Sequence, residues 1–474
     1  MRILFVEPPK DTWFVMGEYL PPPYGIIQLA TWLERETEDI DIEVLDCNAQ
    51  LLDWNDLERR IESSRPDIVA SSSLATCNTY VSVRTLETAK RVDQNILTVT
   101  GGQHFTANAQ ESLERYPEID IIVRGEGERT LTDVVLNAQR RSAFPSIKGI
   151  SFRHEGKIIH NKPRPLIEDL ECLPYPGYHL VKGHVDKYHF AAMAGRDAPY
   201  VLIEGSRGCD HECTFCTQWR HWEGSWRSKS AERIADEIEF CSRNYGSRFV
   251  WLTDDNLGFG ARANDLAGQI IRRRMPQDLS WFVQARCDDI IRNEKVLPKL
   301  RRSGLNWVLL GVENSEQSTL DVFRKGITTS DAKRSVELLK RNGILAHAMF
   351  IIGNRDDTTQ SISKLREFAE ELDPDFVIFA ILTPFPGTDL FDEAKRNGWI
   401  EDHNWSNYDM VHAIMPTKTL SRRQVQEELY QCYRSFYGSW NRRIQGVLSS
   451  NEMKRRLYWY MTQKGIVQSL RDLI

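Results

Sequence analysis

The chain has 474 residues, of which 41% are hydrophobic and 27% are charged, and its formal net charge is −6. This composition is typical of globular proteins and excludes collagen-like, disordered and disulfide-rich mini-protein classes, and no apolar run approaches the ~18 residues of a transmembrane segment. The 61 Lys and Arg residues against 67 Asp and Glu residues give no basic excess that would predict a nucleic-acid partner. At about 150 residues per domain, the length predicts about three domains.

Residues 1–145 alternate short apolar runs with helical patterns. Such alternation predicts a Rossmann-like domain, in which crossover helices cover both faces of an open parallel sheet. Ligands of these sheets bind at the carboxyl ends of the strands. The expected strands are 2–7, 42–46, 68–72, 96–100 and 119–123, and the expected helices include 24–36, 56–63 and 80–92.

Residues 146–195 form a predicted connecting region, with a hairpin at 150–152 and 157–159 followed by proline-rich sequence. Residues 196–390 then repeat the strand–helix alternation six times, which predicts a partial (βα)6 barrel with its site on the C-terminal face. The expected strands are 200–205, 249–253, 281–285, 307–312, 346–352 and 376–382, and the helices include 231–242, 295–303, 331–341 and 362–372.

Residues 391–474 are predicted to be helical and are rich in aromatic side chains. From Ser421 onward this region holds ten Lys or Arg residues against four Asp or Glu residues. A helical cap that packs its aromatic stripe on the barrel is one interpretation. Docking to an acidic substrate, a protein partner or an anionic membrane is the alternative.

Three of the nine cysteines fall within eight residues, at Cys209, Cys213 and Cys216. In a C-x3-C-x2-C pattern, each thiolate can ligate one iron of a [4Fe–4S] cluster and leave the fourth iron open. A zinc site ordinarily takes four ligands, and His211 lies inside the loop, where its geometry is poor. A non-enzymatic zinc or storage-cluster module remains the alternative from another class. The first apolar residues run directly into Glu7-Pro8-Pro9, so we expect no leader segment. Because the other cysteines are sparse, we also expect a reducing, cytoplasmic location.

This cysteine motif, with Phe215 before its last cysteine and a barrel strand before the loop, resembles the radical S-adenosylmethionine (SAM) superfamily. The resemblance implies that Phe215 lies at the SAM site and that the amino and carboxylate groups of SAM chelate the open iron. One electron, from a ferredoxin or flavodoxin donor, then cleaves SAM to methionine and a 5′-deoxyadenosyl radical.

The resemblance also assigns residues at the ends of the following strands. Asp254 and Asp255 correspond to the acidic stretch that binds the SAM amino group, and Glu313 to the residue that holds the ribose. Arg286 suits the carboxylate through its bidentate fork, and Ile352 ends the segment under adenine. The residues after Gly353 depart from the usual Gly-x-Pro-Gly-Glu-Thr sequence. Helix caps and structural ion pairs are the alternative interpretation of these side chains.

Three N-terminal motifs and one barrel segment resemble the cobalamin-domain branch of this superfamily. They are Pro22–Ile26, Val99–His104, Val123–Glu128 and Pro384–Thr388. Glycines after the strands allow a flat corrin to approach the backbone closely. The D-x-H-x-x-G motif is absent, so we expect no protein histidine on cobalt; the same absence fits a domain without cobalamin. The expected cobalamin residues are Pro23, Tyr24, Ser72, Gly101, Gly102, His104, Gly125 and Glu126, with His104 placed either at the nucleotide tail or on the surface.

The resemblance implies a cobalamin-dependent radical SAM C-methyltransferase that methylates an unactivated carbon and consumes two SAM per turnover. One candidate substrate is a peptidyl residue, such as the glutamine of methyl-coenzyme M reductase. The alternatives are a ring-forming enzyme of the anaerobic magnesium-protoporphyrin cyclase type, which the chain also resembles, and a radical SAM enzyme with a cobalamin-free Rossmann domain. Cys287, beside Arg286, has either a role in the chemistry or a structural role.

Overall fold

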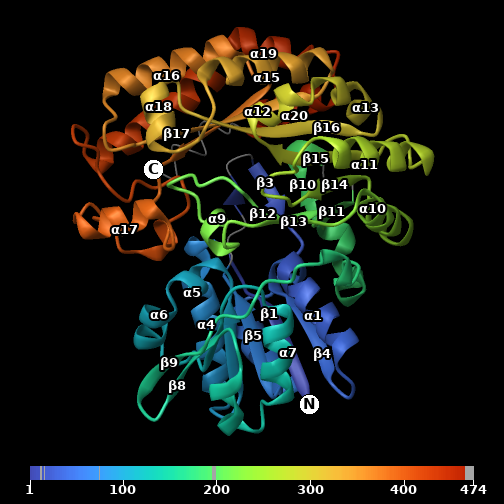
Figure 1. Ribbon diagram of the computed structural model, residues 1–474, viewed down its shortest axis with the longest axis vertical. Coiled ribbons are helices and arrows are strands. Elements are labelled where there is room, and N and C mark those ends of the chain that lie inside the picture. The colour runs from blue at the N-terminus through green and yellow to red at the C-terminus, as the bar shows by residue number, and fades with distance from the viewer. Residues whose placement is uncertain (11–12, 15–16, 74, 195–198, 465–474) are drawn as a thin grey trace.

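The computed structural model of the chain describes residues 1–10, 13–14, 17–73, 75–194 and 199–464. Two α/β units lie one above the other, and the C-terminal helices cover the outer side of the second unit (Figure 1). This arrangement confirms the predicted fold class of a Rossmann-like domain, a partial barrel and a helical C-terminal region. No helix among the described residues is long and apolar enough to cross a membrane.

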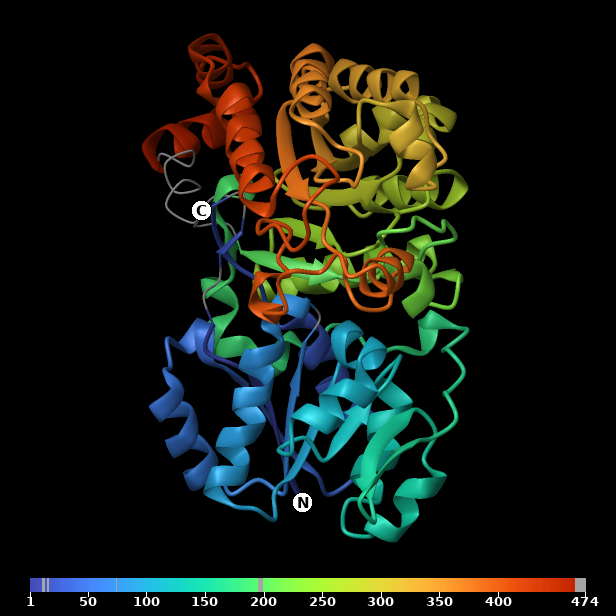
Figure 2. The same cartoon turned by 90° about the vertical axis from the view of Figure 1, so that its left-hand side faces the viewer.

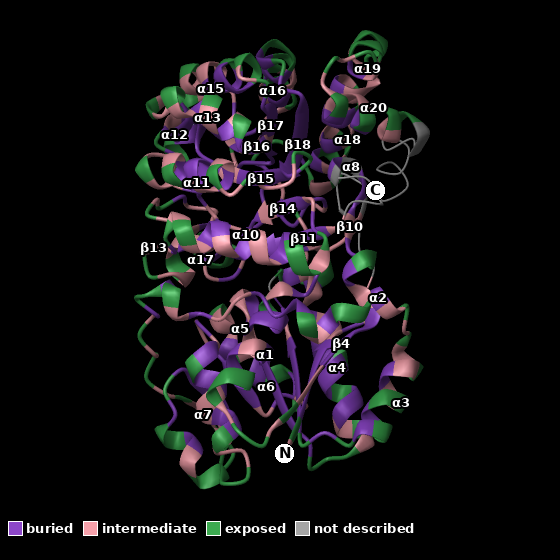
Figure 3. Cartoon of the chain, turned by 90° about the vertical axis from the view of Figure 1, so that its right-hand side faces the viewer, coloured by how far each residue is buried: buried purple, intermediate pink, exposed green. Residues whose placement is uncertain are grey.

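The first unit is built on a sheet whose described strands follow the order β4-β1-β5-β6-β7-β8-β9. The first five pair in parallel, and the central four residues of β1 are buried, as expected where helices cover both faces (Figure 3). This order places the topological switch point between β1 and β5, where ligands of such sheets bind. The parallel strands are β1 (Arg2–Glu7), β4 (Asp41–Asp46), β5 (Ile68–Ser72), β6 (Leu97–Gly101) and β7 (Ile121–Val123).

Helices connect these strands, and one of them, α3, begins at a side-chain cap. Asp53 and Asp56 form a capping box at the start of α3, which fixes where that helix begins. The principal helices of the unit are α1 (Tyr24–Glu36), α3 (Trp54–Ser64), α4 (Thr79–Val92), α5 (Gln103–Ala107), α6 (Ala109–Arg115) and α7 (Glu128–Leu136).

The hairpin expected in the connecting region extends the first sheet. β8 (Ile150–His154) pairs antiparallel with β7, and β9 (Lys157–His160) pairs antiparallel with β8. The proline-rich segment that follows leads to β10 (His189–Phe190), which pairs with β3 (Gly17–Leu20) in a small separate sheet; β3 pairs in turn with β2 (Trp13–Phe14).

The second unit is a six-stranded parallel sheet in the order β11-β14-β15-β16-β17-β18 across the described residues. Its strands begin and end within two residues of the six expected ones; the first, for example, ends at Ile203 instead of residue 205. The strands are β11 (Tyr200–Ile203), β14 (Phe249–Leu252), β15 (Ser280–Ala285), β16 (Leu305–Glu313), β17 (Leu345–Ile352) and β18 (Phe376–Ile381). The outer helices include α10 (Ala231–Tyr245), α11 (Ala261–Arg272), α12 (Cys287–Arg292), α13 (Leu297–Arg302), α14 (Gln317–Val322), α15 (Thr329–Arg341) and α16 (Thr359–Leu372).

The cysteine loop therefore follows a second short strand and does not leave the first barrel strand directly. β12 (Ser206–Gly208) pairs antiparallel with β13 (Trp226–Ser228). The chain turns out of the barrel sheet because the Asp254 carboxylate accepts hydrogen bonds from the Gly205 N–H at 2.7 Å and the Ser206 hydroxyl at 2.6 Å. The cysteine loop is thus the connection inside a β-hairpin that projects toward the first unit.

The C-terminal helices α17 (Asp389–Arg396), α18 (Arg422–Gly438), α19 (Trp440–Val447) and α20 (Glu452–Lys464) complete the fold. The Tyr433 hydroxyl, from α18, donates to the Phe379 carbonyl at 2.9 Å and accepts from its N–H at 3.2 Å. Tyr437 makes the same two bonds to Val377. These tyrosines satisfy the open edge of β18, so part of the aromatic C-terminal region is a structural cap on the barrel.

Candidate active site between the two α/β units

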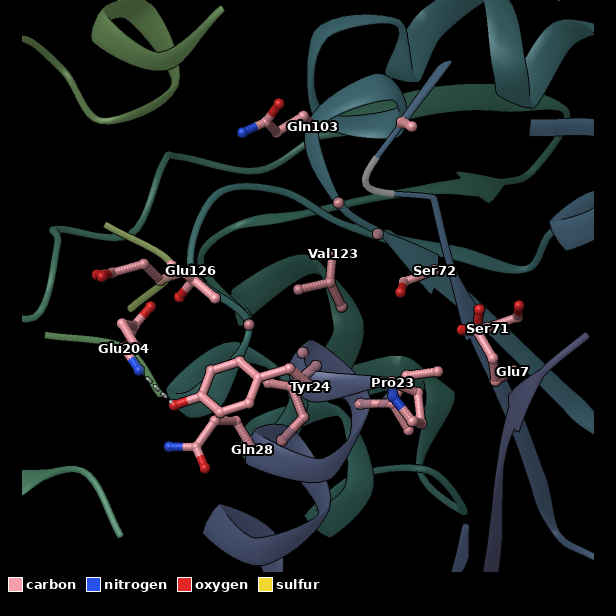
Figure 4. A pocket seen from close by; sticks show the side chains of 18 of the residues that line it. Glu7, Pro23, Tyr24, Gln28, Ser71, Ser72, Gln103, Val123, Glu126 and Glu204 are labelled. Carbon is pink, nitrogen blue, oxygen red and sulfur yellow. Dashed lines mark hydrogen bonds between the residues drawn. The ribbon is translucent and has the colours of Figure 1, made fainter. Parts of the chain in front are cut away.

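A cavity of about 540 Å³ lies between the two units. The carboxyl ends of β1, β5 and β6 and the first turn of α1 form one side, and the loops after β11 and β14 form the other (Figure 4). The cavity therefore lies at the switch point of the first sheet. Seven of the eight expected cobalamin residues line it: Pro23, Tyr24, Ser72, Gly101, Gly102, Gly125 and Glu126.

The backbone geometry of the cavity wall requires glycine at three positions. A Cβ atom at Gly101 would lie 2.8 Å from the carbonyl oxygen of Val123 on the neighbouring strand. Gly102 and Gly125 have φ angles of 93° and 70°, which are unfavourable for residues with a side chain. The result is a smooth backbone surface that fits a flat ligand such as a corrin ring.

His104 does not line this cavity, and the surface position expected for it is wrong. The residue is 2% exposed and packs edge-on against Trp405, with 5.0 Å between ring centroids. Neither ring nitrogen has a hydrogen-bond partner, and burial lowers the pKa of His104 to about 4. Trp405 comes from the C-terminal region, so no local sequence pattern showed that His104, in α5, would be covered.

Glu126 joins the two units through buried arginines. Arg207, on β12, donates to Glu126 at 2.8 Å, to Glu128 at 2.6 Å and to Glu204 at 2.9 Å, and Arg227 donates to Glu126 at 2.9 Å. Burial would raise the pKa of Glu128, but Arg207 outweighs that effect and lowers it. Glu126 thus has a structural role, which sequence reasoning missed because its partners lie 80 to 100 residues further along the chain.

Two further contacts hold the units together around the cavity. The Tyr24 hydroxyl accepts a hydrogen bond from the Glu204 N–H at 3.1 Å (Figure 4). The Gln103 side chain accepts from the Thr217 hydroxyl at 3.1 Å and donates to Gln218 at 2.8 Å, which ties α5 to the residues after the cysteine loop. The first unit therefore contacts the chain both before and after the cysteine loop.

The three cysteines lie in a loop whose backbone is fixed from outside. The Thr214 N–H donates to the Phe323 carbonyl at 3.1 Å, and the Trp219 indole donates to the Cys213 carbonyl at 3.1 Å. Phe215 packs edge-on against Phe323, with centroids 5.0 Å apart. These contacts orient the loop at the mouth of the barrel.

The thiol chemistry of this loop fits a cluster better than a single ion. The thiols of Cys209, Cys213 and Cys216 are near enough to interact electrostatically, and burial raises the pKa of each, that of Cys216 to about 12. Among the described residues, no three His, Cys, Asp or Glu side chains converge on a point that one metal ion would occupy. A [4Fe–4S] cluster binds each thiolate to a different iron and needs no such convergence.

The two aspartates after β14 have different environments. Asp254 is fully buried and committed to Gly205, Ser206 and Arg262, the last at 3.3 Å. Asp255 lines the cavity, and burial together with the neighbouring Asp254 raises its pKa to about 7. Asp255 is therefore the carboxyl group available to a ligand, and Asp254 positions the hairpin.

Arg286 and Glu313 both contact Lys325, a residue that the sequence analysis did not identify. Arg286 donates to the Lys325 carbonyl at 2.7 Å, and the Lys325 ammonium donates to Glu313 at 2.6 Å. Burial opposes the charge on Lys325, but Glu313 outweighs it and raises the lysine pKa. Glu313 has a φ of 65°, and its second carboxylate oxygen is buried without a partner. That oxygen is a free acceptor at the end of β16.

Ile352 is fully buried at the end of β17, and its carbonyl accepts from the Leu382 N–H at 2.8 Å. The next loop departs from the family sequence but is well ordered by Asp357, whose carboxylate accepts from the N–H groups of Gly353 at 2.8 Å and Asn354 at 3.0 Å. Cys287 is buried, and its thiol lies 3.9 Å from the Gly311 carbonyl. This placement supports the structural interpretation of Cys287.

Comparisons with known proteins agree with this architecture. The model of the radical SAM superfamily matches residues 203–369, and that of the B12 binding domain matches residues 16–135. An uncharacterized methyltransferase of Pyrococcus horikoshii is 31% identical over 440 residues, or 92% of both chains. The anaerobic magnesium-protoporphyrin IX monomethyl ester cyclase of Rubrivivax gelatinosus is 29% identical over 99% of this chain and 83% of its own length.

A solved structure shares the fold over the whole chain. The radical SAM methyltransferase TsrM of Kitasatospora setae, solved with cobalamin and a [4Fe–4S] cluster, aligns with a TM-score of 0.71 and 17% identity. The alignment covers 100% of this chain and 99% of that one.

Proposed function

The chain belongs to the radical SAM superfamily, in the group of enzymes that carry an N-terminal B12-binding domain, and we propose that it is a C-methyltransferase acting on an unactivated carbon. Its cofactors are a [4Fe–4S] cluster, SAM and cobalamin. We propose that each turnover consumes two SAM, one as methyl donor and one as radical source.

The observation that carries this proposal is a single cavity with walls from both units. The glycine-lined surface of the first sheet and Asp255 of the barrel face the same space. The hairpin that holds the cysteines is attached to the first unit by Arg207 and Gln218. A methyl donor on the first unit and a radical source on the second would therefore act on one substrate.

In this proposal the chain's own residues bind, orient and exclude water. Cys209, Cys213 and Cys216 would hold the cluster; Asp255, Arg286 and Glu313 would bind SAM, with Phe215 and Ile352 on the apolar side. Pro23, Tyr24, Ser72, Gly101, Gly102 and Gly125 would form the corrin surface. When bound, the cluster supplies the electron that cleaves SAM, and cobalamin supplies a transferable methyl group.

The test is an anaerobic reaction of the reconstituted enzyme with methyl-labelled SAM, a reductant and extract of the host cell. We expect label in one product fraction and equal amounts of S-adenosylhomocysteine and 5′-deoxyadenosine. Label in a protein digest would support a peptidyl substrate such as a glutamine side chain. The Cys209→Ala variant should form no 5′-deoxyadenosine, and its continued formation would reject the assigned cluster ligands.

A second candidate is ring formation without net methyl transfer. The observation that favours it is the similarity to the magnesium-protoporphyrin cyclase along 99% of this chain. Formation of 5′-deoxyadenosine without S-adenosylhomocysteine or labelled product would favour this candidate over methyl transfer.

The same enzyme requires a reductant, and we propose a ferredoxin or flavodoxin in a reducing compartment such as the cytoplasm. All nine cysteines are free in the structure, which fits that compartment. Either donor should replace a chemical reductant in the assay; failure of both would reject this part of the proposal.

A further inference from the structure

Large hydrophobic side chains are exposed together on α19 and α20. Trp440, Ile444, Leu448 and Trp459 are 74%, 55%, 76% and 50% exposed. Single exposed hydrophobic residues are common on protein surfaces, but four between residues 440 and 459 form a patch, which commonly marks an interaction site. The other exposed large hydrophobic residues of the described chain, Leu51, Leu136, Val322 and Met410, are spread over separate segments.

Helix geometry shows that three of these residues form one stripe that faces away from the protein. Trp440, Ile444 and Leu448 are spaced four residues apart, so they lie on the same side of α19. Gly446 lies on the opposite side, where an added Cβ would come within 2.2 Å of the Tyr458 ring on α20. One face of α19 therefore packs against α20, and the apolar stripe lies on another face that is not part of the core.

The surroundings of the stripe are basic. Residues 439–464 contain six Lys or Arg residues and one acidic residue, Glu452. Arg442 and Lys454 are committed to Asp373 at 2.9 Å and Asp375 at 2.6 Å. Arg443 lies 5.6 Å from the Trp440 ring and donates to the Tyr437 carbonyl at 2.7 Å, and half-buried Arg455 donates to the Ser449 carbonyl at 2.7 Å. These carbonyl bonds leave the positive charges in place, and Arg456 adds an exposed guanidinium.

The position of these helices leaves the stripe accessible. Helix α19 lies near the end of the molecule farthest from the first sheet, and half of its residues are exposed (Figures 2 and 3). A large flat partner could contact it without reaching the cavity between the two units.

We propose that α19 and α20 form a peripheral docking surface for an anionic phospholipid membrane. Tryptophan side chains favour the membrane–water interface, apolar side chains insert below the headgroups, and neighbouring arginines are attracted to anionic lipids. The net basic charge of this segment favours an anionic lipid surface over a neutral one. Such docking needs no membrane-spanning helix.

The experiment is flotation of the full-length reconstituted enzyme with phospholipid vesicles. We expect binding to phosphatidylcholine vesicles that contain about one third phosphatidylglycerol and at least tenfold weaker binding to phosphatidylcholine alone. Raising the salt from about 0.1 M to about 0.5 M should weaken the binding, because screening reduces the attraction. A blue shift of tryptophan fluorescence on binding that is smaller in Trp440→Ser than in the wild type would place the stripe in the membrane.

Two matched variants separate the patch from general hydrophobicity. The W440S/I444S/L448S enzyme should lose at least tenfold in vesicle binding and still form 5′-deoxyadenosine, since the patch is remote from the cavity. The L51S/L136S enzyme, which removes exposed leucines elsewhere, should bind like the wild type.

Three results would overturn the proposal. They are no binding of the wild type to anionic vesicles, equal binding by W440S/I444S/L448S, and a concentration-dependent dimer that this variant abolishes. The last result would assign the stripe to a second copy of the chain.

Discussion

Replacing Arg207 with methionine should destabilise the protein more than any exposed charge substitution. The Arg207 side chain is 6% exposed and contacts Glu126, Glu128 and Glu204 within 2.9 Å. Arg207→Met removes the cation and leaves carboxylates in a buried site. Removing one partner of a buried ion pair costs about 3–5 kcal/mol. At roughly 2 °C per kcal/mol, the melting temperature should fall by about 6–10 °C.

The pH dependence of this loss identifies its cause. In the wild type the depressed pKa of Glu128 adds stability above the unfolded-state pKa, and that stability is lost as the pH falls through the folded-state pKa. Without Arg207, burial raises the pKa of this carboxyl, so the folded variant loses stability as the pH rises. The deficit should therefore be larger near pH 8 than near pH 5.

The assay is urea and thermal denaturation of the metal-free protein under anaerobic conditions, at both pH values. Arg59→Met is the matched control, because Arg59 pairs with Asp56 while 68% exposed, and such surface pairs contribute about 0–1 kcal/mol. A loss below about 1 kcal/mol for Arg207→Met, or a deficit that is larger near pH 5, would refute the reasoning.

Three further predictions concern single side chains. Cys209→Ala should reduce 5′-deoxyadenosine formation by more than about a hundredfold and remove the visible absorbance of the reconstituted protein, whereas Cys241→Ala should retain both; equal iron content in the two variants would contradict the assigned ligands. Asp255→Asn should weaken SAM binding, and it should stabilise the metal-free protein near pH 8 but little below pH 4. The gain is about 1.4 kcal/mol for each unit by which burial and Asp254 raise the pKa of this carboxyl. A change in urea denaturation that does not depend on pH would contradict the destabilising buried charge. His104→Phe should be more stable than the wild type near pH 5, because protonation of the unfolded chain at His104 is removed, and should retain cobalamin by absorbance; loss of cobalamin would show that His104 contacts it.

The sequence determined the order of the elements and the chemistry of the cysteine loop. Strands and helices can be located from local sequence, because short apolar runs and period-3.6 patterns arise from neighbouring residues. For that reason the expected strands of both sheets lie close to the observed ones. The spacing of Cys209, Cys213 and Cys216 likewise contains its own chemical information, since three thiolates within eight residues leave one iron of a cluster open.

Only the tertiary structure decided what each polar side chain does. Asp254 and Asp255 are identical neighbours in the sequence, yet one positions the hairpin and the other faces the cavity. His104 is covered by Trp405, Glu126 binds Arg207, and Glu313 pairs with Lys325. Each of these partners comes from a different element, so no local pattern predicts the contact. Burial and charge pairing are set by packing between distant segments, and packing is what a single sequence does not display.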